Sequence, residues 1–146
     1  MEIKHLLRIR VLPDKVFAAI TTQKGLSSWW TEESKVNSSE LNSILEFSFT
    51  GKHPIKMKVT QLKKDELVEW ECIEEDGHRK WADTKITFNL KKEDPNTTVL
   101  TFTHSGWKDN LDDEEIPNSN YNWGRFLYSL KTYCETGKGF PVVARK

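Results

Sequence analysis

Four histidines are the side chains best suited to chemistry in this sequence, because an unperturbed imidazole pKa of about 6.5 favours proton transfer near neutral pH. They stand at positions 5, 53, 78 and 104, and none has a cysteine or carboxylate at metal-ligand spacing. We therefore predict no metal site. His104 shares the register of Leu100 and Phe102, which places a polar ring among apolar side chains. This pattern favours a structural histidine, and leaves a ligand anchor or a general base as alternatives.

Carboxylates and thiols are the other candidates. Glu69 and Glu71 are two residues apart on a predicted strand, so they share a face, as paired acid–base carboxylates would. The opposite register holds Trp70 and Cys72, which indicates that the glutamates face water. Neither Cys72 nor Cys134 has a recognisable histidine partner for nucleophilic catalysis. No phosphate-binding glycine loop, zinc-protease motif or serine-hydrolase motif occurs. We predict no catalytic residue and no cofactor.

An unusual number of tryptophans favours binding over catalysis. Ligand pockets are mostly apolar with a few polar anchors, although large rings also fill ordinary cores. Because Trp29 and Trp30 are adjacent, we expect one near a cavity and the other near the surface. Trp107 follows Gly106 at a predicted strand end, where it would sit at a cavity rim. The six tryptophans are Trp29, Trp30, Trp70, Trp81, Trp107 and Trp123.

Composition limits the classes of protein to consider. The 146 residues suit one domain, and 22 basic against 22 acidic residues give zero formal net charge. Nothing here favours nucleic acid or an anionic membrane as a partner. The chain opens without a secretory pattern, no stretch approaches the roughly 20 apolar residues of a membrane span, and the two cysteines are far apart. We expect free thiols and a cytoplasmic location.

Alternation of apolar and polar residues predicts six strands. They lie near residues 3–11, 45–49, 55–60, 68–72, 84–90 and 99–104, joined by hairpin-length links that favour antiparallel pairing. Two short helices or one kinked helix fit between Pro13 and Trp30, where Gly25 interrupts an apolar stripe. The polar segment 31–43 is predicted as a loop containing a brief strand.

The last quarter of the chain predicts one long helix from Pro117 to Gly139. Asn118, Ser119 and Asn120 offer N-cap oxygens, and the acidic run before them is expected to be a solvated loop. The apolar face carries the i, i+3, i+4, i+7 spacing of a helix that covers a sheet: Trp123, Phe126, Leu127, Leu130, Tyr133 and Cys134. Gly124 is unusual in a helix interior, and either packs closely against a strand or leaves room for a ligand. One α+β domain over residues 1–146 is predicted.

The order of these elements resembles the helix-grip (START-like, Bet v-like, SRPBCC) superfamily. Within it, the chain is similar to the activator of heat-shock-protein-90 ATPase homologue family. The similarity covers nearly the whole chain and rests on PDKVFAAITTQKGLSSWW, TKITFNL, TVLTFTHSGW and the closing WGRFLYSLKTYCETGKG. It implies a curved six-stranded antiparallel sheet around the long C-terminal helix, two short helices after the first strand, and a deep cavity between sheet and helix.

The resemblance implies three functions for that cavity or its surroundings. The first is binding of a small hydrophobic ligand such as a lipid, the second a co-chaperone-type interaction that stimulates a chaperone ATPase in a stress response, and the third an enzyme with His104 as base. The chaperone activator matches only through its C-terminal half. The predicted ligand-binding residues are Phe17, Trp29, Phe47, Met57, Trp70, Phe88, His104, Trp107, Trp123, Phe126, Leu127 and Leu130.

Overall fold

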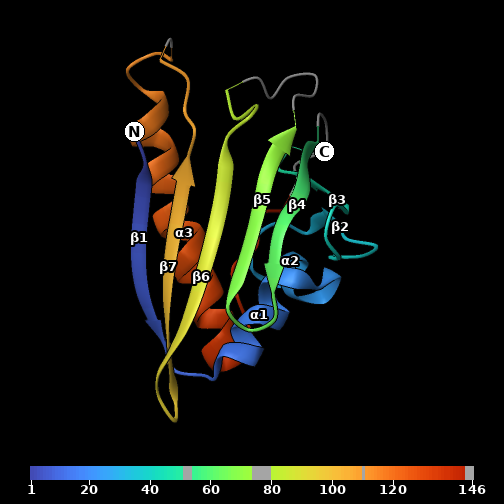
Figure 1. The fold of residues 1–146 in the computed structure, drawn as a ribbon, viewed down its shortest axis with the longest axis vertical. Helices are drawn as coiled ribbons and strands as arrows, with labels where there is room; N and C mark the ends of the chain where they lie inside the picture. The colour runs from blue at the N-terminus through green and yellow to red at the C-terminus, as the bar shows by residue number, and fades with distance from the viewer. Residues whose placement is uncertain (51–53, 74–79, 110, 144–146) are drawn as a thin grey trace.

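A single antiparallel sheet forms the framework of the protein. The computed structural model describes residues 1–50, 54–73, 80–109 and 111–143. The sheet has seven strands in the order β1-β7-β6-β5-β4-β3-β2, each antiparallel to its neighbours (Figure 1). The strands are β1 (Ile3–Ile9), β2 (Glu33–Lys35), β3 (Ile44–Ser48), β4 (Ile55–Lys63), β5 (Leu67–Ile73), β6 (Lys85–Asp94) and β7 (Thr97–Ser105).

The expected strand count of six is corrected to seven, because the brief strand expected in segment 31–43 joins the sheet as β2. Its three residues show no apolar alternation, and the inward residue is the polar Ser34. Side-chain contacts hold it instead. The Gln23 amide donates to the Ser34 carbonyl at 2.7 Å and accepts from the Val36 N–H at 2.7 Å.

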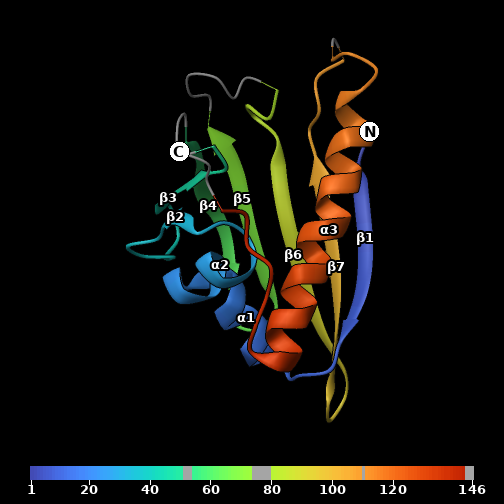
Figure 2. The same ribbon diagram turned by 180° about the vertical axis from the view of Figure 1, so that it is seen from behind.

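All three helices lie on one face of the sheet. The long helix α3 (Glu115–Thr136) crosses behind β1, β7 and β6 in Figure 1, and Figure 2 shows α1 (Pro13–Thr21) and α2 (Gln23–Trp29) beside it over β4 and β5. The two short helices are therefore separate, as one of the two expectations held. Pro13 begins α1 at a position where its missing N–H would have no helical partner.

Helix α3 begins two residues earlier than the sequence indicates. The expected caps at Asn118–Asn120 lie inside the helix, and part of the acidic run becomes its first turn. The N-cap residue is Glu114, and Asp112 holds the turn before the helix, because its Oδ1 accepts from the N–H groups of Glu114 and Glu115 at 3.1 Å each. A hydrogen bond from Lys80 at 3.3 Å is the main reason why the pKa of Asp112 is lowered. Gly137, with φ of 87°, ends the helix in the left-handed region.

Aromatic rings fill the space between the sheet and α3. Trp30 stacks on Trp29 and on Trp70, with ring centroids 5.8 Å apart in both pairs. Phe102 of β7 meets Trp123 of α3 at 4.4 Å. We call the aromatic core the fully buried set Trp29, Trp30, Phe47, Trp70, Phe88, Phe102 and Trp123. The expectation that either Trp29 or Trp30 lies near the surface is wrong, since both side chains are fully buried.

The end of α2 explains how both adjacent tryptophans are buried. Trp29 points back into the helical layer and donates its indole N–H to the Ala19 carbonyl at 2.8 Å. Trp30 lies one residue past the helix and packs toward the sheet, with its ring 4.5 Å from that of Phe47. Successive side chains at a helix end diverge by about 100°, so one can face each layer.

The segment after α3 turns back and packs between α3 and α2 (Figure 2). Val142 forms a parallel bridge with Thr31, donating to the Trp30 carbonyl at 2.8 Å and accepting from Glu32 at 3.0 Å. Ser129 of α3 joins three elements, because its hydroxyl donates to the Trp29 carbonyl at 2.8 Å and accepts from the Phe140 N–H at 2.7 Å. These contacts fix the segment from 137 to 143 against the helical layer.

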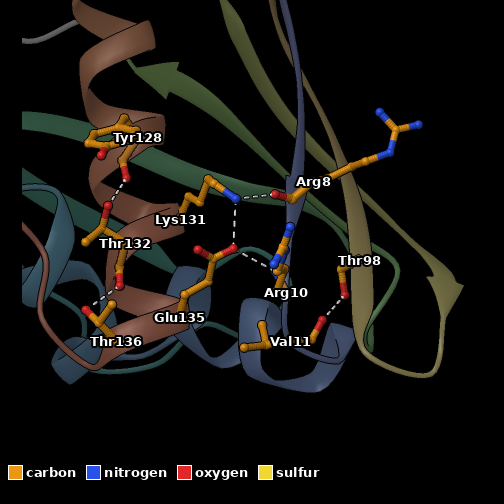
Figure 3. Close-up of polar contacts among 9 residues, drawn as sticks. All are labelled: Arg8, Arg10, Val11, Thr98, Tyr128, Lys131, Thr132, Glu135 and Thr136. Atoms are coloured by element: carbon orange, nitrogen blue, oxygen red, sulfur yellow. Dashed lines mark hydrogen bonds and ion pairs between the residues drawn. The ribbon is translucent and has the colours of Figure 1, made fainter.

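Side chains of α3 also close the far edge of the sheet. β1 is an edge strand, and Lys131 donates to its Arg8 carbonyl at 2.6 Å while Glu135 accepts from the Arg10 N–H at 2.8 Å. The two α3 side chains also pair with each other, with Lys131 Nζ 2.8 Å from Glu135 Oε2 (Figure 3). Partial burial acts to raise the pKa of Glu135, but the hydrogen bonds from Lys131 and Arg10 give a net lowering.

Gly124 lies against β1 and offers a stability test. A methyl group at this position would lie 3.7 Å from Cε1 of His5, an ordinary contact distance. We therefore expect Gly124→Ala to stabilise the protein by about 0.8–1 kcal/mol, the gain in helix propensity. Urea denaturation measures this directly. A less stable variant would contradict the ordinary contact distance to His5 and show that Gly124 packs too closely against β1 for a methyl group.

Candidate ligand pocket

A pocket of about 530 Å³ opens between α3, the β3–β4 end of the sheet and the C-terminal segment. The aromatic core lies behind this pocket. The Trp30 ring centroid is 5.4 Å from that of Phe49 and 6.2 Å from that of Phe126, and both phenylalanines line the pocket. This volume falls within the range of typical small-molecule sites. Its described lining residues are Phe49, Ile55, Trp81, Asn122, Arg125, Phe126, Tyr128, Phe140 and Val142.

Among the described lining residues, the polar side chains other than the Trp81 indole come from α3. Asn122 and Arg125 are three residues apart, and Tyr128 follows after three more, so they lie near one another along the helix. Arg125 is exposed and lies 5.9 Å from the centroid of the Tyr121 ring. Among the described residues that line the pocket, no aspartate or glutamate occurs. The described lining of the pocket is therefore largely apolar, with the positive charge of Arg125 at its helical wall.

His104 is fully buried and has a hydrogen-bond partner on each ring nitrogen. The Trp123 indole N–H can only donate, and it lies 3.0 Å from Nδ1 of His104. Nδ1 is therefore the acceptor, so the proton sits on Nε2, which donates to the Thr84 hydroxyl at 2.8 Å. Thr84 in turn donates to the Trp81 carbonyl at 2.6 Å. The contacts define a neutral imidazole in one tautomer.

The hypothesis of His104 as a general base is corrected by this geometry. Burial lowers its pKa from 6.5 to about 3, and neither ring nitrogen is free to accept a substrate proton. Thiol chemistry is equally disfavoured, because burial raises the pKa of both Cys72 and Cys134 to about 12. Within the described part of the chain, no group of histidine, cysteine or acidic residues could hold a metal ion. His53 and His78 lie outside the described residues.

Most of the predicted ligand-binding residues belong to the packed core. Phe126 alone of the twelve lines the 530 Å³ pocket. Trp107 donates to the His104 carbonyl at 2.9 Å and borders a separate 440 Å³ pocket beside the start of α3. Phe17 is half-buried against the core, and ligand contact by the remaining residues stays a prediction. Those fully or almost fully buried are Trp29, Phe47, Met57, Trp70, Phe88, His104, Trp123, Leu127 and Leu130.

The pocket residues that sequence reasoning missed had weak signals. Asn122 and Arg125 precede Phe126 by one helical turn or less, so they flank a residue that was predicted. Phe140 and Val142 follow the glycines that end the helix, in a short apolar stretch without a period. That stretch was a usable signal, because apolar residues after the end of a helix can pack back against the fold.

Glu69 and Glu71 are half-buried on the other sheet face, opposite Trp70, as expected.

The curved antiparallel sheet with a long C-terminal helix packed across one face is the arrangement of START-like (SRPBCC) domains. The chain belongs to the family described as Activator of Hsp90 ATPase homolog 1-like protein, whose model matches residues 10–135. The membership supports a ligand-binding or co-chaperone-like domain. No significant match was found among curated proteins.

Solved structures agree with this family. The solution structure of the Aha1 dimer from Colwellia psychrerythraea is 33% identical, with a TM-score of 0.81 over 95% of this chain and 99% of that one. A Staphylococcus saprophyticus protein is 17% identical, with a TM-score of 0.78 and 98% of each chain covered. A Bacillus halodurans protein is 23% identical, with a TM-score of 0.73 over 92% of this chain and 97% of that one. The last two support the fold alone.

Helix α3, the longest in the described residues, carries too many polar side chains to cross a bilayer, and no other described helix is long and apolar enough to do so.

Proposed function

We propose that this protein binds a small hydrophobic ligand in the pocket between α3, β3–β4 and the C-terminal segment. The observation that supports this most directly is a cavity of about 530 Å³ whose lining is largely aromatic and aliphatic. Each buried methylene group of a ligand contributes roughly 0.8 kcal/mol, so a medium-length alkyl chain gains enough from burial to bind. The aromatic core behind the pocket is already packed and gives the ligand a firm wall.

Filling the pocket from its C-terminal wall tests this proposal. Val142 lines the pocket, whereas the next residue, Val143, is 63% exposed and is not part of the lining. Val142→Trp is expected to weaken binding of the neutral fluorophore N-phenyl-1-naphthylamine at least tenfold, because the indole occupies the ligand's space. Val143→Trp is the matched control and is expected to bind like the original protein. A fluorescence titration measures both, with thermal melting to confirm folding.

Equal affinity in the original protein and both variants would contradict the proposed pocket. Native mass spectrometry of the protein isolated from its own cells adds an independent result. A retained small molecule supports ligand binding. A retained chaperone ATPase without a small molecule would favour instead the co-chaperone-type interaction, for which the similarity to the Aha1 dimer is the supporting observation.

A further inference from the structure

Among the described lining residues of the pocket, Arg125 is the one with a charged side chain, and its charge bears on which hydrophobic ligands fit. Arg125 lies on α3 beside Asn122 and Phe126, where the polar wall of the pocket meets its apolar interior. The opposite walls consist of Phe49 and Ile55 from the sheet and Phe140 from the C-terminal segment. A ligand lying across the pocket would therefore meet apolar side chains along most of its length and a positive charge at α3.

Arg125 has no acidic partner among the described residues, unlike the paired cations Arg8, Lys131 and Lys80. Arg8 pairs with Glu93 at 2.9 Å, Lys131 with Glu135 at 2.8 Å, and Lys80 with both Asp112 and Glu115. Over the residues that the structure describes, no carboxylate lies within 4.0 Å of the Arg125 guanidinium. Its described contact is the face of the Tyr121 ring, whose centroid lies 5.9 Å from the guanidinium carbon, and a ring face takes up no conventional hydrogen-bond acceptor site for the N–H groups.

We propose that the pocket takes an anionic amphiphile, with its alkyl chain against the apolar walls and its carboxylate or phosphate group on Arg125. This inference rests on the proposed hydrophobic site and adds the charge of the ligand. A guanidinium presents two parallel N–H donors that match a carboxylate or phosphate in bidentate geometry. Asn122 and Tyr128 border the same wall and offer further donors to the headgroup.

A matched set of probes with one alkyl chain separates the charge from the apolar contribution. Dodecanoate, dodecyl phosphate and dodecanol share a chain and differ in the headgroup. Each probe's affinity is measured by displacement of N-phenyl-1-naphthylamine at pH 7.5, low salt and concentrations below micelle formation. We expect both anions to bind about tenfold more tightly than dodecanol, because a charge-assisted hydrogen bond usually contributes that much. The preference should shrink as salt is raised, because Arg125 is exposed. The stronger of the two anions identifies the headgroup.

Two substitutions locate the effect at Arg125. Arg125→Met keeps most of the apolar stem and is expected to bring both anions to the affinity of dodecanol. Arg125→Glu is expected to reverse the preference, so that dodecylammonium binds more tightly than dodecanoate. Arg8→Met is the control, because it removes a guanidinium that points away from α3 and pairs with Glu93 (Figure 3).

The outcomes distinguish this inference from the function on which it rests. Tighter binding of the anions that disappears in Arg125→Met supports it. Equal binding of dodecanol and both anions overturns the charge preference while the hydrophobic site stands. An anion preference that survives in both Arg125 variants overturns the assignment to this residue. Displacement by none of the probes overturns the hydrophobic site itself, and the inference with it.

Discussion

Acidification from pH 7 to pH 5 is expected to destabilise the protein by about 2 kcal/mol through His104 alone. The folded protein holds this imidazole neutral, with its pKa lowered from 6.5 to about 3 by burial. The unfolded chain takes up the proton near pH 6.5, so the unfolded state binds more protons below that value. Stability from this group is complete above about pH 6.5 and falls by about 1.4 kcal/mol per pH unit until the folded pKa is reached.

Urea denaturation at pH 7, 6 and 5 measures this slope. His104→Leu keeps a similar volume and removes the titration, so its stability should change much less over the same range. The variant should also be less stable at pH 7 by about 2–4 kcal/mol, because the buried Trp123 N–H loses its acceptor and the Thr84 hydroxyl loses a donor.

His5→Leu is the control for this titration, since it retains His104. The buried Nε2 of His5 has no hydrogen-bond partner within the described structure, so its removal should cost less than the loss of His104. The carboxyl groups of Asp112 and Glu135, whose pKa values are lowered, lose their stabilising effect at lower pH than this experiment reaches. A wild-type slope equal to that of His104→Leu would show that His104 does not carry the effect.

Gly139→Ala is expected to destabilise the protein by about 1–3 kcal/mol and to weaken ligand binding, in contrast to the stabilising Gly124→Ala. A methyl group at residue 139 would lie 2.7 Å from the Ser28 carbonyl oxygen and 3.0 Å from the Ser129 hydroxyl. The first neighbour is backbone of α2 and cannot rotate away. The C-terminal segment must therefore move, and Phe140 and Val142 leave the pocket wall with it.

Two measurements test this pair of glycines together. The urea concentration at the midpoint of unfolding should be lower for Gly139→Ala and higher for Gly124→Ala than for the original protein. The affinity for N-phenyl-1-naphthylamine should fall for Gly139→Ala and stay unchanged for Gly124→Ala, which does not border the pocket. If Gly139→Ala retained both stability and affinity, the close packing of the C-terminal segment would be refuted.

The sequence predicted the sheet well because its strands bury one face. Leu45, Phe47, Met57 and Trp70 alternate with polar residues, and a period of two residues assigns their face without further information. The place of β2 in the sheet could not be predicted from alternation, because its pairing depends on Gln23 and on β3. The start of α3 was misplaced because the turn before it is held by Asp112, three residues ahead of the helix, and not by a side chain of Asn118–Asn120.

The site was harder to predict than the fold. Burial patterns identify side chains that face the interior, but they do not show which of them leave space. From the sequence, large rings such as Trp30 and Trp70 could equally line a pocket or fill the core. In the structure both are fully buried and stack on each other. The open volume lies where a non-periodic segment, Phe140 to Val142, meets the side of α3 that carries Arg125. No spacing rule in the sequence relates those two parts of the chain.

The contacts along the edges of the sheet bear on how copies of this chain can associate. On the β2 side, the Val142 backbone is hydrogen-bonded to the Trp30 carbonyl and the Glu32 N–H. The Gln23 amide is hydrogen-bonded to the Ser34 carbonyl and the Val36 N–H, further along the same edge. On the β1 side, Lys131 and Glu135 are hydrogen-bonded in the same manner to the Arg8 carbonyl and the Arg10 N–H. On the β2 side an incoming strand must displace these groups before it can add to the sheet, whereas on the β1 side the contacts cover only the end of the strand at Arg8. Edge-to-edge growth on the β2 side would require Gln23 or the C-terminal segment to detach first.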